Sequence, residues 1–357
     1  MRVETLLPLG KVDPGLRRAE IPLDLHRIGE TAKLVEDLGY DGLVFEETKD
    51  DPFVLLALAA STTARVSLSS SVAIAFPRSP TVTAMSAWTL QKLSRGRFTL
   101  GLGPQVMAHI RRRYGVQPSK PGPWMRDYVR AVRAVWSCWQ HRTKLDFASE
   151  HYRLDLMVPL FDPGPIEHPD IPIHLAAVNP VMCRIAGEVA DGIRPHPVCT
   201  PSYIEDVMLP AARQGAGTDR KLAVCMKPLV ASARTEAELQ PRIRDARARI
   251  AFYASTPGYR RAFDHLGLGD LADAAKRLSR DQRWEDLPAL ISDEVLDAFA
   301  VIGTYDTVAQ SLVDRFGRVV TSCEFSIQVR DEQDRATLAH MVRWIQSQSA
   351  RTAEVSL

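Results

Sequence analysis

One stretch of the chain combines two glycines with a cluster of arginines, a pairing that suits an anionic ligand. Residues 93–116 read LSRGRFTLGLGPQVMAHIRRRYGV, so a short apolar run ends in Gly-Leu-Gly and three arginines follow within ten residues. Glycines at the end of a strand let a flat or anionic ligand approach the backbone, and arginines bind phosphate or carboxylate. We therefore name Gly101, Gly103 and Gln105 as candidate cofactor contacts. The alternative is a plain turn, since most such glycine pairs are turns.

The arginines Arg111, Arg112 and Arg113 follow this loop on a segment with helical character. At about 100° per residue their side chains cannot all face one way, so two can reach a ligand while the third contacts protein or solvent. We name Arg111 and Arg112 as cofactor contacts, together with His109. The alternatives are a solvated helix face for the arginines and a structural role for the histidine.

Four carboxylates crowd into the segment EETKDD, from Glu46 to Asp51. Burial and like-charge crowding raise the pKa of a carboxyl group, which suits it to general acid or base catalysis. Glu47 and Asp50 are the catalytic candidates here, although a structural role for Glu47 stays equally open. Asp51 precedes Pro52 and is expected to cap a helix. His196 is a third candidate proton donor, against the structural role that a lone histidine more often has.

Two further segments carry polar groups at expected strand ends. Ser69, Ser70 and Ser71 lie in an otherwise apolar run, where hydroxyls are costly unless they find partners. A bulge beside a planar ligand would explain them, and so would hydrogen bonds inside the fold. Val178 and Asn179 lead into a predicted helix, whose free N–H groups and dipole would bind an anion. An ordinary turn is the alternative there.

The elements that must position these residues alternate between strands and helices. The apolar patterns predict strands at 3–7, 42–45, 66–74, 97–102, 171–176, 192–195, 222–231 and 322–329. Helices are predicted at 25–38, 52–60, 81–93, 123–140, 181–190, 203–214, 236–253 and 334–348. Eight strand–helix units with right-handed crossovers indicate an α/β fold, a (β/α)8 TIM barrel with insertions. A doubly wound open sheet is the alternative, but it would leave the later strands unplaced.

We expect a single domain over residues 1–357, with insertions near 145–165 and 256–298. Residues 145–154 are predicted to form a small hairpin, and 256–298 a charged helical insertion. Because the C-terminal ends of barrel strands gather at one face, the polar segments above would meet there in a cofactor pocket.

The composition narrows the class of protein. The chain has 357 residues and a formal net charge of +2, and so small a net charge does not indicate nucleic-acid binding. Its five cysteines are widely spaced and predict buried thiols in a reducing compartment. No apolar run suggests a signal peptide or a membrane span, and no His/Cys spacing suggests a metal site. A cytoplasmic protein without a metal centre is expected.

The chain resembles the luciferase-like monooxygenase superfamily, in its branch of coenzyme F420-dependent oxidoreductases. The residues that carry this resemblance are GYDGLVFEETKDDPF at 39–53, SVAIAFPRSP at 71–80, the glycine–arginine segment at 93–115, AGEVADGIRPHP at 186–197 and DEVLDAFAVIGTYDTVAQSL at 293–312. Together they span most of the chain.

The resemblance implies a cofactor ring in the mouth of a (β/α)8 barrel. A non-proline cis peptide, here Ser70-Ser71 or Ser71-Val72, would support the back of the ring. The family's phosphate site falls on Ala177, Val178 and Asn179. The anionic tail of the cofactor would then run toward Arg111 and Arg112.

The departures from the family pattern bear on the reaction. Relatives that oxidise sugar phosphates carry an Asp-His pair and a Glu where this chain has Glu47-Thr48 and Pro104. In the nearest branch we expect a Thr in place of Pro104 and a His in place of Asp50. The base and the acid that assist removal of a hydride from an alcohol are therefore missing. The loss of a hydroxyl donor at Pro104 and the acid at Asp50 imply a specialised substrate.

Three functions remain open from the sequence. The first is a reductase that uses reduced F420 on a C=C or C=N bond of a natural product, either a small molecule or a modified peptide. The second is an FMNH2-dependent monooxygenase, which must shield its flavin intermediate from water. The third is a cofactor-binding protein without turnover. A homodimer is expected, with neither nucleic acid nor membrane as partner.

Overall fold

The computed structural model describes residues 1–11, 22–217 and 221–348, and its centre is a closed parallel barrel. The strands follow the order β3-β2-β1-β13-β10-β9-β8-β5-β4, and an additional pairing of β3 with β5 closes the ring. β3 and β4 both pair with β5 and act as two parts of one interrupted strand, so the barrel has eight positions. The predicted (β/α)8 fold is confirmed. The barrel strands are β1 (Arg2–Leu6), β2 (Gly42–Phe45), β3 (Ser67–Ser70), β4 (Ala73–Ile74), β5 (Phe98–Gly103), β8 (Ile173–Ala177), β9 (Gly192–Pro195), β10 (Ala223–Met226) and β13 (Ser322–Glu324).

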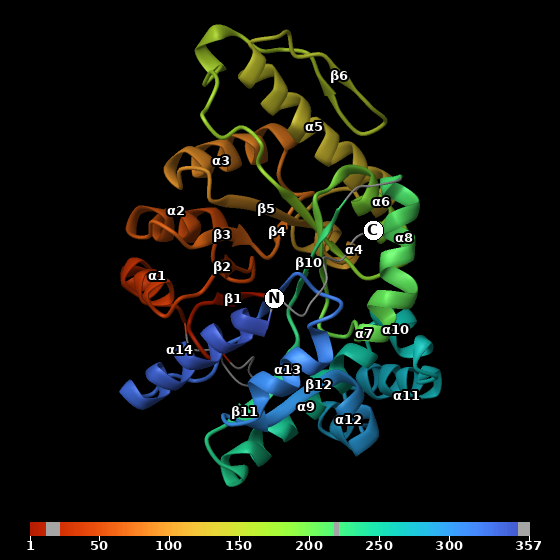
Figure 1. The fold of residues 1–357 in the computed structure, drawn as a ribbon. Helices are drawn as coiled ribbons and strands as arrows, with labels where there is room; N and C mark the ends of the chain where they lie inside the picture. Colours follow the sequence, from red (N-terminus) through yellow and green to blue (C-terminus); the bar gives the residue numbers. More distant parts are fainter. Residues whose placement is uncertain (12–21, 218–220, 349–357) are drawn as a thin grey trace.

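Helices surround this barrel and cover its apolar outer face. Figure 1 shows α1, α2 and α3 along one side, α6 and α8 on the other, and the group from α9 to α13 below the barrel. The helices are α1 (Ile28–Asp37), α2 (Pro52–Thr62), α3 (Pro80–Leu93), α4 (Met107–Arg112), α5 (Pro121–His141), α6 (Pro180–Val189), α7 (Pro201–Tyr203), α8 (Leu209–Ala216), α9 (Glu236–Ala254), α10 (Arg260–His265), α11 (Gly269–Arg280), α12 (Asp293–Phe299), α13 (Val308–Phe316) and α14 (Glu332–Ser347).

Helix α2 illustrates how local sequence sets the element boundaries. The carboxylate of Asp51 accepts a hydrogen bond of 2.8 Å from the N–H of Phe53, and Pro52 occupies the first turn. A capping acid before a proline is a strong start signal, because proline needs no hydrogen-bond partner there. The predicted helix cap at Asp51 is confirmed.

The third barrel strand is interrupted where the serines lie. The Ser71–Val72 peptide is cis, one of the two positions that the family resemblance implied. The Ser70 hydroxyl is buried, accepts from the N–H of Gly101 at 2.9 Å and donates to its carbonyl at 2.8 Å. Strand β5 therefore approaches β3 closely at Gly101. A Cβ atom at this glycine would lie 1.9 Å from the Ser70 carbonyl oxygen.

Two predicted strands differ from the structure. The run predicted at 222–231 divides into β10, in the barrel, and β11 (Leu229–Ala233), which pairs with β12 (Ala300–Thr304) outside it. Pro228 lies between the two parts and has no N–H with which to continue a ladder. The strand predicted at 322–329 ends at Glu324. Strand β12 and helix α13 had no counterpart among the predicted elements.

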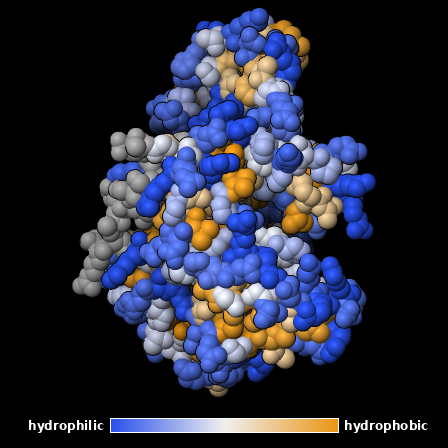
Figure 2. Space-filling view, turned by 90° about the vertical axis from the view of Figure 1, so that its right-hand side faces the viewer, coloured by the Kyte–Doolittle hydropathy of each residue, from blue (hydrophilic) through white to orange (hydrophobic). Residues whose placement is uncertain are grey.

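The two predicted insertions contain regular elements of their own. Within 145–165, β6 (Phe147–Ala148) pairs antiparallel with β7 (Arg153–Leu154). The chain then exposes Leu156, Leu160 and Phe161, by 78%, 86% and 71%. This insertion forms the upper end of the molecule, where Figure 2 shows hydrophobic residues among hydrophilic ones. The insertion at 256–298 contains α10, α11 and most of α12.

All five cysteines lie in the described ranges, where they are buried and form no disulfide. The predicted buried thiols are confirmed. In residues 1–11, 22–217 and 221–348, every helix is too short or too polar to cross a membrane.

We predict that Gly101→Ala destabilises the protein by about 3 kcal/mol, because the new methyl group would meet backbone and not a flexible side chain. Gly258→Ala is the matched control, since the space around Gly258 is open. Thermal unfolding of the two variants measures the difference. Equal melting temperatures would mean that β3 and β5 can separate at no cost, contrary to the close approach described above.

Candidate active site

The C-terminal ends of the barrel strands form a mouth, and most of the predicted cofactor contacts lie on its β4–β5–β8 side. Val72 is half-buried there, and its Cγ2 atom would lie 2.6 Å from a Cβ at Gly103. The Ala176 side chain borders the same glycine. The absence of a Cβ atom at Gly101 and Gly103 therefore makes room for Ser70 and Val72, which are the nearest neighbours of these glycines. Neither has a positive φ, so the backbone conformation does not require glycine.

A buried arginine organises the lumen beneath this part of the mouth. Arg194 donates to the Glu4 carboxylate at 3.1 Å and to the hydroxyls of Ser69 and Ser71, each at 3.2 Å. Burial alone would lower the pKa of Arg194, but the Glu4 carboxylate raises it above the ordinary value. The serines are therefore explained by hydrogen bonds within the barrel, one of the two interpretations open from the sequence. Of the three, Ser71 is the one with partial exposure to the mouth.

Glu47 is held in an ion pair that the sequence did not reveal. Its carboxylate accepts from the Ile74 N–H at 2.7 Å and from the Arg78 guanidinium at 2.7 and 2.9 Å. Arg78 also pairs with Asp51 at 2.9 Å. Such contacts stabilise a carboxylate as an acceptor, so the geometry favours an anchoring role for Glu47 over proton donation. Asp50 lies half-buried in the same connection between β2 and α2.

Helix α4 starts just beyond the end of β5 and presents the arginine cluster on the rim of the mouth. Gln105 leads into it with a φ of +55°, and its side-chain oxygen accepts from the Val106 N–H. His109, Arg111 and Arg112 are exposed. Arg113 is exposed as well, and it donates to the Thr48 carbonyl at 3.2 Å. One of the three arginines thus contacts protein, and the contact of Arg111 and Arg112 with a ligand stays a prediction.

The start of helix α6 offers backbone donors on the same side of the mouth. Asn179 is its N-cap residue, but the Asn179 amide donates to the Gly258 carbonyl at 3.2 Å and, among the described residues, no side chain caps the helix. The Val178 carbonyl accepts from the Tyr203 hydroxyl, and Ala177 is buried. The first N–H groups of α6 are therefore available to an anion. An uncapped helix and two exposed arginines fit a cofactor with a phosphate and a polyanionic tail.

His196 follows β9 and packs among aromatic rings. Its imidazole stacks on Tyr259 at a centroid distance of 4.0 Å and meets the edge-on ring of Tyr253 at 4.6 Å. Burial lowers the pKa of His196 to about 3, with a smaller effect from Lys227. The imidazole is neutral at ordinary pH and cannot act there as a cationic acid. This packing favours the structural role that the sequence left open.

The opposite side of the mouth contains a cavity that none of the predicted site residues line. It has a volume of about 140 Å³, opens to solvent, and lies between the ends of β1, β10 and β13 and helix α9. Lys227 and Glu324 line it, and Lys227 also pairs with Glu46. Sequence reasoning missed both residues. The available signal was a charged residue within a predicted apolar strand, which is costly unless it serves a purpose.

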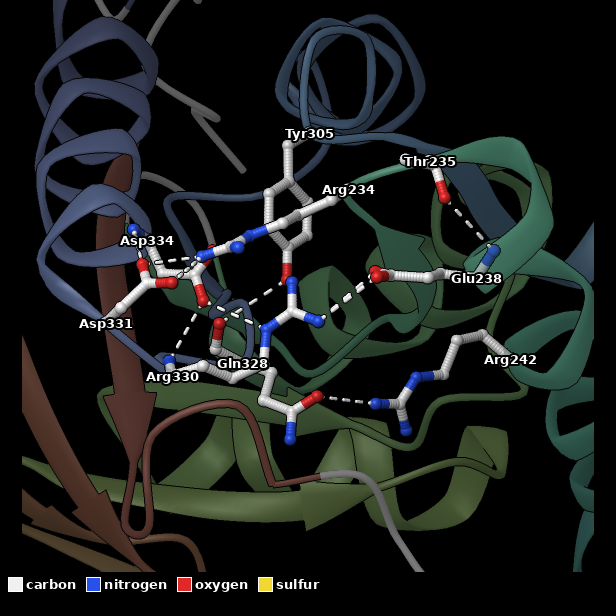
Figure 3. A network of polar contacts seen from close by, with 9 residues as sticks. All are labelled: Arg234, Thr235, Glu238, Arg242, Tyr305, Gln328, Arg330, Asp331 and Asp334. Atoms are coloured by element: carbon white, nitrogen blue, oxygen red, sulfur yellow. Dashed lines mark hydrogen bonds and ion pairs between the residues drawn. The ribbon is translucent and has the colours of Figure 1, made fainter.

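A polar network fixes the cavity wall formed by α9. Arg234 pairs with Asp331 at 2.5 Å and with Asp334 at 2.6 Å, as Figure 3 shows. Arg330 pairs with Asp334 at 3.1 Å and with Glu238 of α9 at 3.3 Å, so it links the two acids. One helical turn further, Arg242 of α9 donates to the Gln328 side chain at 2.9 Å. The network ties α9 to the chain between β13 and α14, and so holds the cavity wall against the barrel.

Comparison with known proteins identifies the family. The family model for luciferase-like monooxygenases matches residues 1–322. The chain belongs to the luciferase-like monooxygenase family. An uncharacterized protein of Mycobacterium tuberculosis is 41% identical over 304 residues, which cover 84% of this chain and 89% of that protein. A second protein of this species, provisionally named a coenzyme F420-dependent oxidoreductase, is 31% identical over 79% of this chain and 85% of its own length.

Solved structures share the fold of this luciferase-like protein. The coenzyme F420-dependent tetrahydromethanopterin reductase of Methanopyrus kandleri has a TM-score of 0.70 at 20% identity, covering 95% of this chain and 96% of its own. The EDTA monooxygenase of Chelativorans sp. has a TM-score of 0.67 at 14% identity, covering 98% and 94%. Proteins that share this fold thus include an F420-dependent reductase and a monooxygenase.

For this luciferase-like protein we predict that His196→Phe weakens the loss of stability in acid. The unfolded chain binds a proton at His196 below pH 6.5, whereas the folded protein does so only near pH 3, so wild-type stability falls as the pH decreases through this range. Phenylalanine preserves the ring stack and removes the titration. Urea unfolding between pH 4 and pH 7 measures the slope, with the exposed His109→Phe as control. Identical slopes for wild type and His196→Phe would contradict the neutral, packed imidazole.

Proposed function

We propose that this protein is an F420H2-dependent reductase that acts on a C=C or C=N bond of a specialised small-molecule or modified-peptide substrate. The observation that carries the proposal is the paired anion site at the mouth, formed by the uncapped start of α6 and the exposed Arg111 and Arg112. F420 carries a phosphate and a lactyl-glutamate tail, so it has anionic groups for both parts. The F420-dependent name of the relative that is 31% identical supports the same cofactor.

Reduction is favoured over alcohol oxidation by the state of Glu47. A base that removes a proton from an alcohol must present its oxygens to the substrate, whereas both Glu47 oxygens accept from Arg78 and one also accepts from Ile74. Thr48 and Pro104 at the corresponding positions supply no other base. In our proposal Glu47 and Arg78 stabilise the mouth and do not exchange the proton.

The side chains have separate roles in this proposal. Ser71, Val72 and Gly103 would border the cofactor ring, while Val178, Asn179 and the two arginines would hold its anionic groups. The bound deazaflavin would supply the hydride. The protein's contribution is orientation: the rigid strand ends set the ring's position, and the α6 dipole with the arginine charges sets the direction of the tail.

We predict that the double substitution Arg111→Ala/Arg112→Ala weakens F420 binding about tenfold and reduces its salt dependence, because two exposed charges near the tail are lost. A tail-less deazaflavin should bind the variant and the wild type equally. The matched control is Lys92→Ala/Arg95→Ala, which removes two exposed charges at the opposite end of the barrel. Fluorescence titration at two salt concentrations measures all three proteins.

Titration of the wild type with FMN tests the alternative. Tighter binding of FMN than of F420, with oxygen uptake by the FMNH2-loaded protein, would replace the proposed reductase by a monooxygenase. Equal weakening of F420 and the tail-less compound in the Arg111→Ala/Arg112→Ala variant would instead give the arginines a structural role.

A further inference from the structure

The cavity beside β1, β10 and β13 contains an acid whose surroundings differ from those of the other carboxylates at the mouth. Glu324 is the last residue of β13, and its side chain is only 9% exposed. Its Oε1 atom lies 3.7 Å from the Lys227 ammonium. Its Oε2 atom is buried and has no hydrogen-bond partner among the described residues. Buried polar atoms are nearly always paired, so an unpaired oxygen at a cavity indicates a partner that arrives with a ligand.

The other charges of the lumen near Glu324 have partners on neighbouring strands. Glu4 is the register partner of Glu324 on β1, so both side chains enter the lumen, but the Glu4 carboxylate is bonded to Arg194. Lys227 is shared, because it also pairs with Glu46 at the end of β2. The charged and titratable groups that act on Glu324 or line its cavity are Glu4, Lys11, Tyr40, Glu46, Arg194, Lys227 and Cys323, together with Arg242, Asp245 and Arg249 of α9.

These surroundings leave Glu324 able to hold a proton near neutral pH. Burial raises the pKa of Glu324 to about 7. Lys227 and Arg194 act to lower this pKa, whereas Glu46 and Glu4 act to raise it. A carboxyl group with a pKa near the working pH can both donate and recover a proton. Glu47, by contrast, accepts hydrogen bonds from Arg78 with both oxygens and from a backbone N–H with one.

We propose that Glu324 is the proton donor of the reduction, and that the cavity it lines receives the unsaturated substrate. This inference rests on the proposed function. The reduced deazaflavin supplies a hydride, which forms a C–H bond as the C=C or C=N π bond breaks. The π electrons pass to the neighbouring atom, which takes the carboxyl proton of Glu324. The cofactor is oxidised by two electrons, the substrate is reduced by two, and Glu324 becomes a carboxylate.

Lys227 has a positioning role in this step. Its ammonium group already lies within 3.7 Å of Glu324, so it can stabilise the carboxylate that proton donation leaves behind. Glu46 compensates the lysine charge while Glu324 is protonated. The cavity needs no large rearrangement between the two protonation states.

The first test is turnover by Glu324→Gln, which preserves shape and removes the acid. F420H2 oxidation is followed with cyclohexenone as C=C probe and a dihydroisoquinoline as C=N probe. We expect unchanged F420 affinity and a maximal rate lower by about 10²–10⁴-fold. Asp127→Asn is the matched control, because Asp127 is similarly buried but lies on α5 and is bonded to His151 at 2.7 Å. Its rate should equal that of the wild type.

The second test needs neither cofactor nor substrate. A raised carboxyl pKa means that the folded protein holds a proton between pH 4.5 and about 7 which the unfolded chain has released. Wild-type stability therefore falls as the pH rises through this range, and Glu324→Gln removes that fall. The melting temperature of the variant, relative to wild type, should increase from pH 5 to pH 8.

The outcomes separate this inference from the function on which it rests. Parallel pH profiles for wild type and Glu324→Gln, or an unchanged rate with either probe, would overturn the role of Glu324. A wild-type protein that binds no F420, or oxidises F420H2 with neither probe, would overturn the proposed reductase, and the proton-donor role with it. The melting profiles would then still report whether Glu324 holds a proton near neutrality.

Discussion

A single buried guanidinium holds the lumen of this barrel together. Arg194 enters from β9, bonds the Glu4 carboxylate of β1 and reaches two serine hydroxyls on and just after β3. A charge in such a place is costly unless it is paired, and removing one partner would leave the other buried and unpaired. The pair therefore constrains three strands that are not neighbours in the sheet. It also accounts for the polar serines in an otherwise apolar strand.

This ion pair lies in the lumen below the mouth. The mouth above it has two sides with different electrostatic character. On the β4–β5–β8 side, the start of α6 and the arginines of α4 present positive potential with partial or full exposure. On the β10–β13–β1 side, Lys227 is compensated by carboxylates within a partly enclosed cavity. In the proposed function, an anionic cofactor would bind on the first side, and the second side would present its acid to the substrate.

Glu47 shows that tertiary contacts decide the role of a carboxylate at a strand end. The strand end places it at the mouth, but Arg78 on the next connection neutralises it and also bonds Asp51. The carboxylates that the sequence placed together are thereby separated in function: Asp51 caps a helix, Glu47 anchors Arg78, and Glu46 turns toward Lys227. Two cations relieve this crowding of like charges: Arg78 pairs with Glu47 and Asp51, and Lys227 pairs with Glu46.

Local signals in the sequence were sufficient for the architecture. Hydrophobic periodicity and start signals such as Asp51-Pro52 depend on neighbours a few residues away, so strand and helix order, and with it the barrel, could be predicted. The break at Pro228 was visible, but its consequence was not, because β11 pairs with a strand some seventy residues later. The sequence shows a glycine at 101, but the reason that no larger residue fits there is the nearby carbonyl of Ser70, which lies on another strand.

The chemistry of the site was decided by tertiary structure alone. The Arg194–Glu4 contact joins residues 190 positions apart, and the Lys227–Glu46 contact joins residues 181 apart. Such contacts arise only when the barrel closes and the strand register turns particular side chains inward. Sequence could therefore name the acids and arginines of the mouth. It could not determine that Arg78 bonds both oxygens of Glu47, that aromatic rings pack on His196, or that Glu324 has an unpaired oxygen. The burial and the partners of these groups depend on the closed fold.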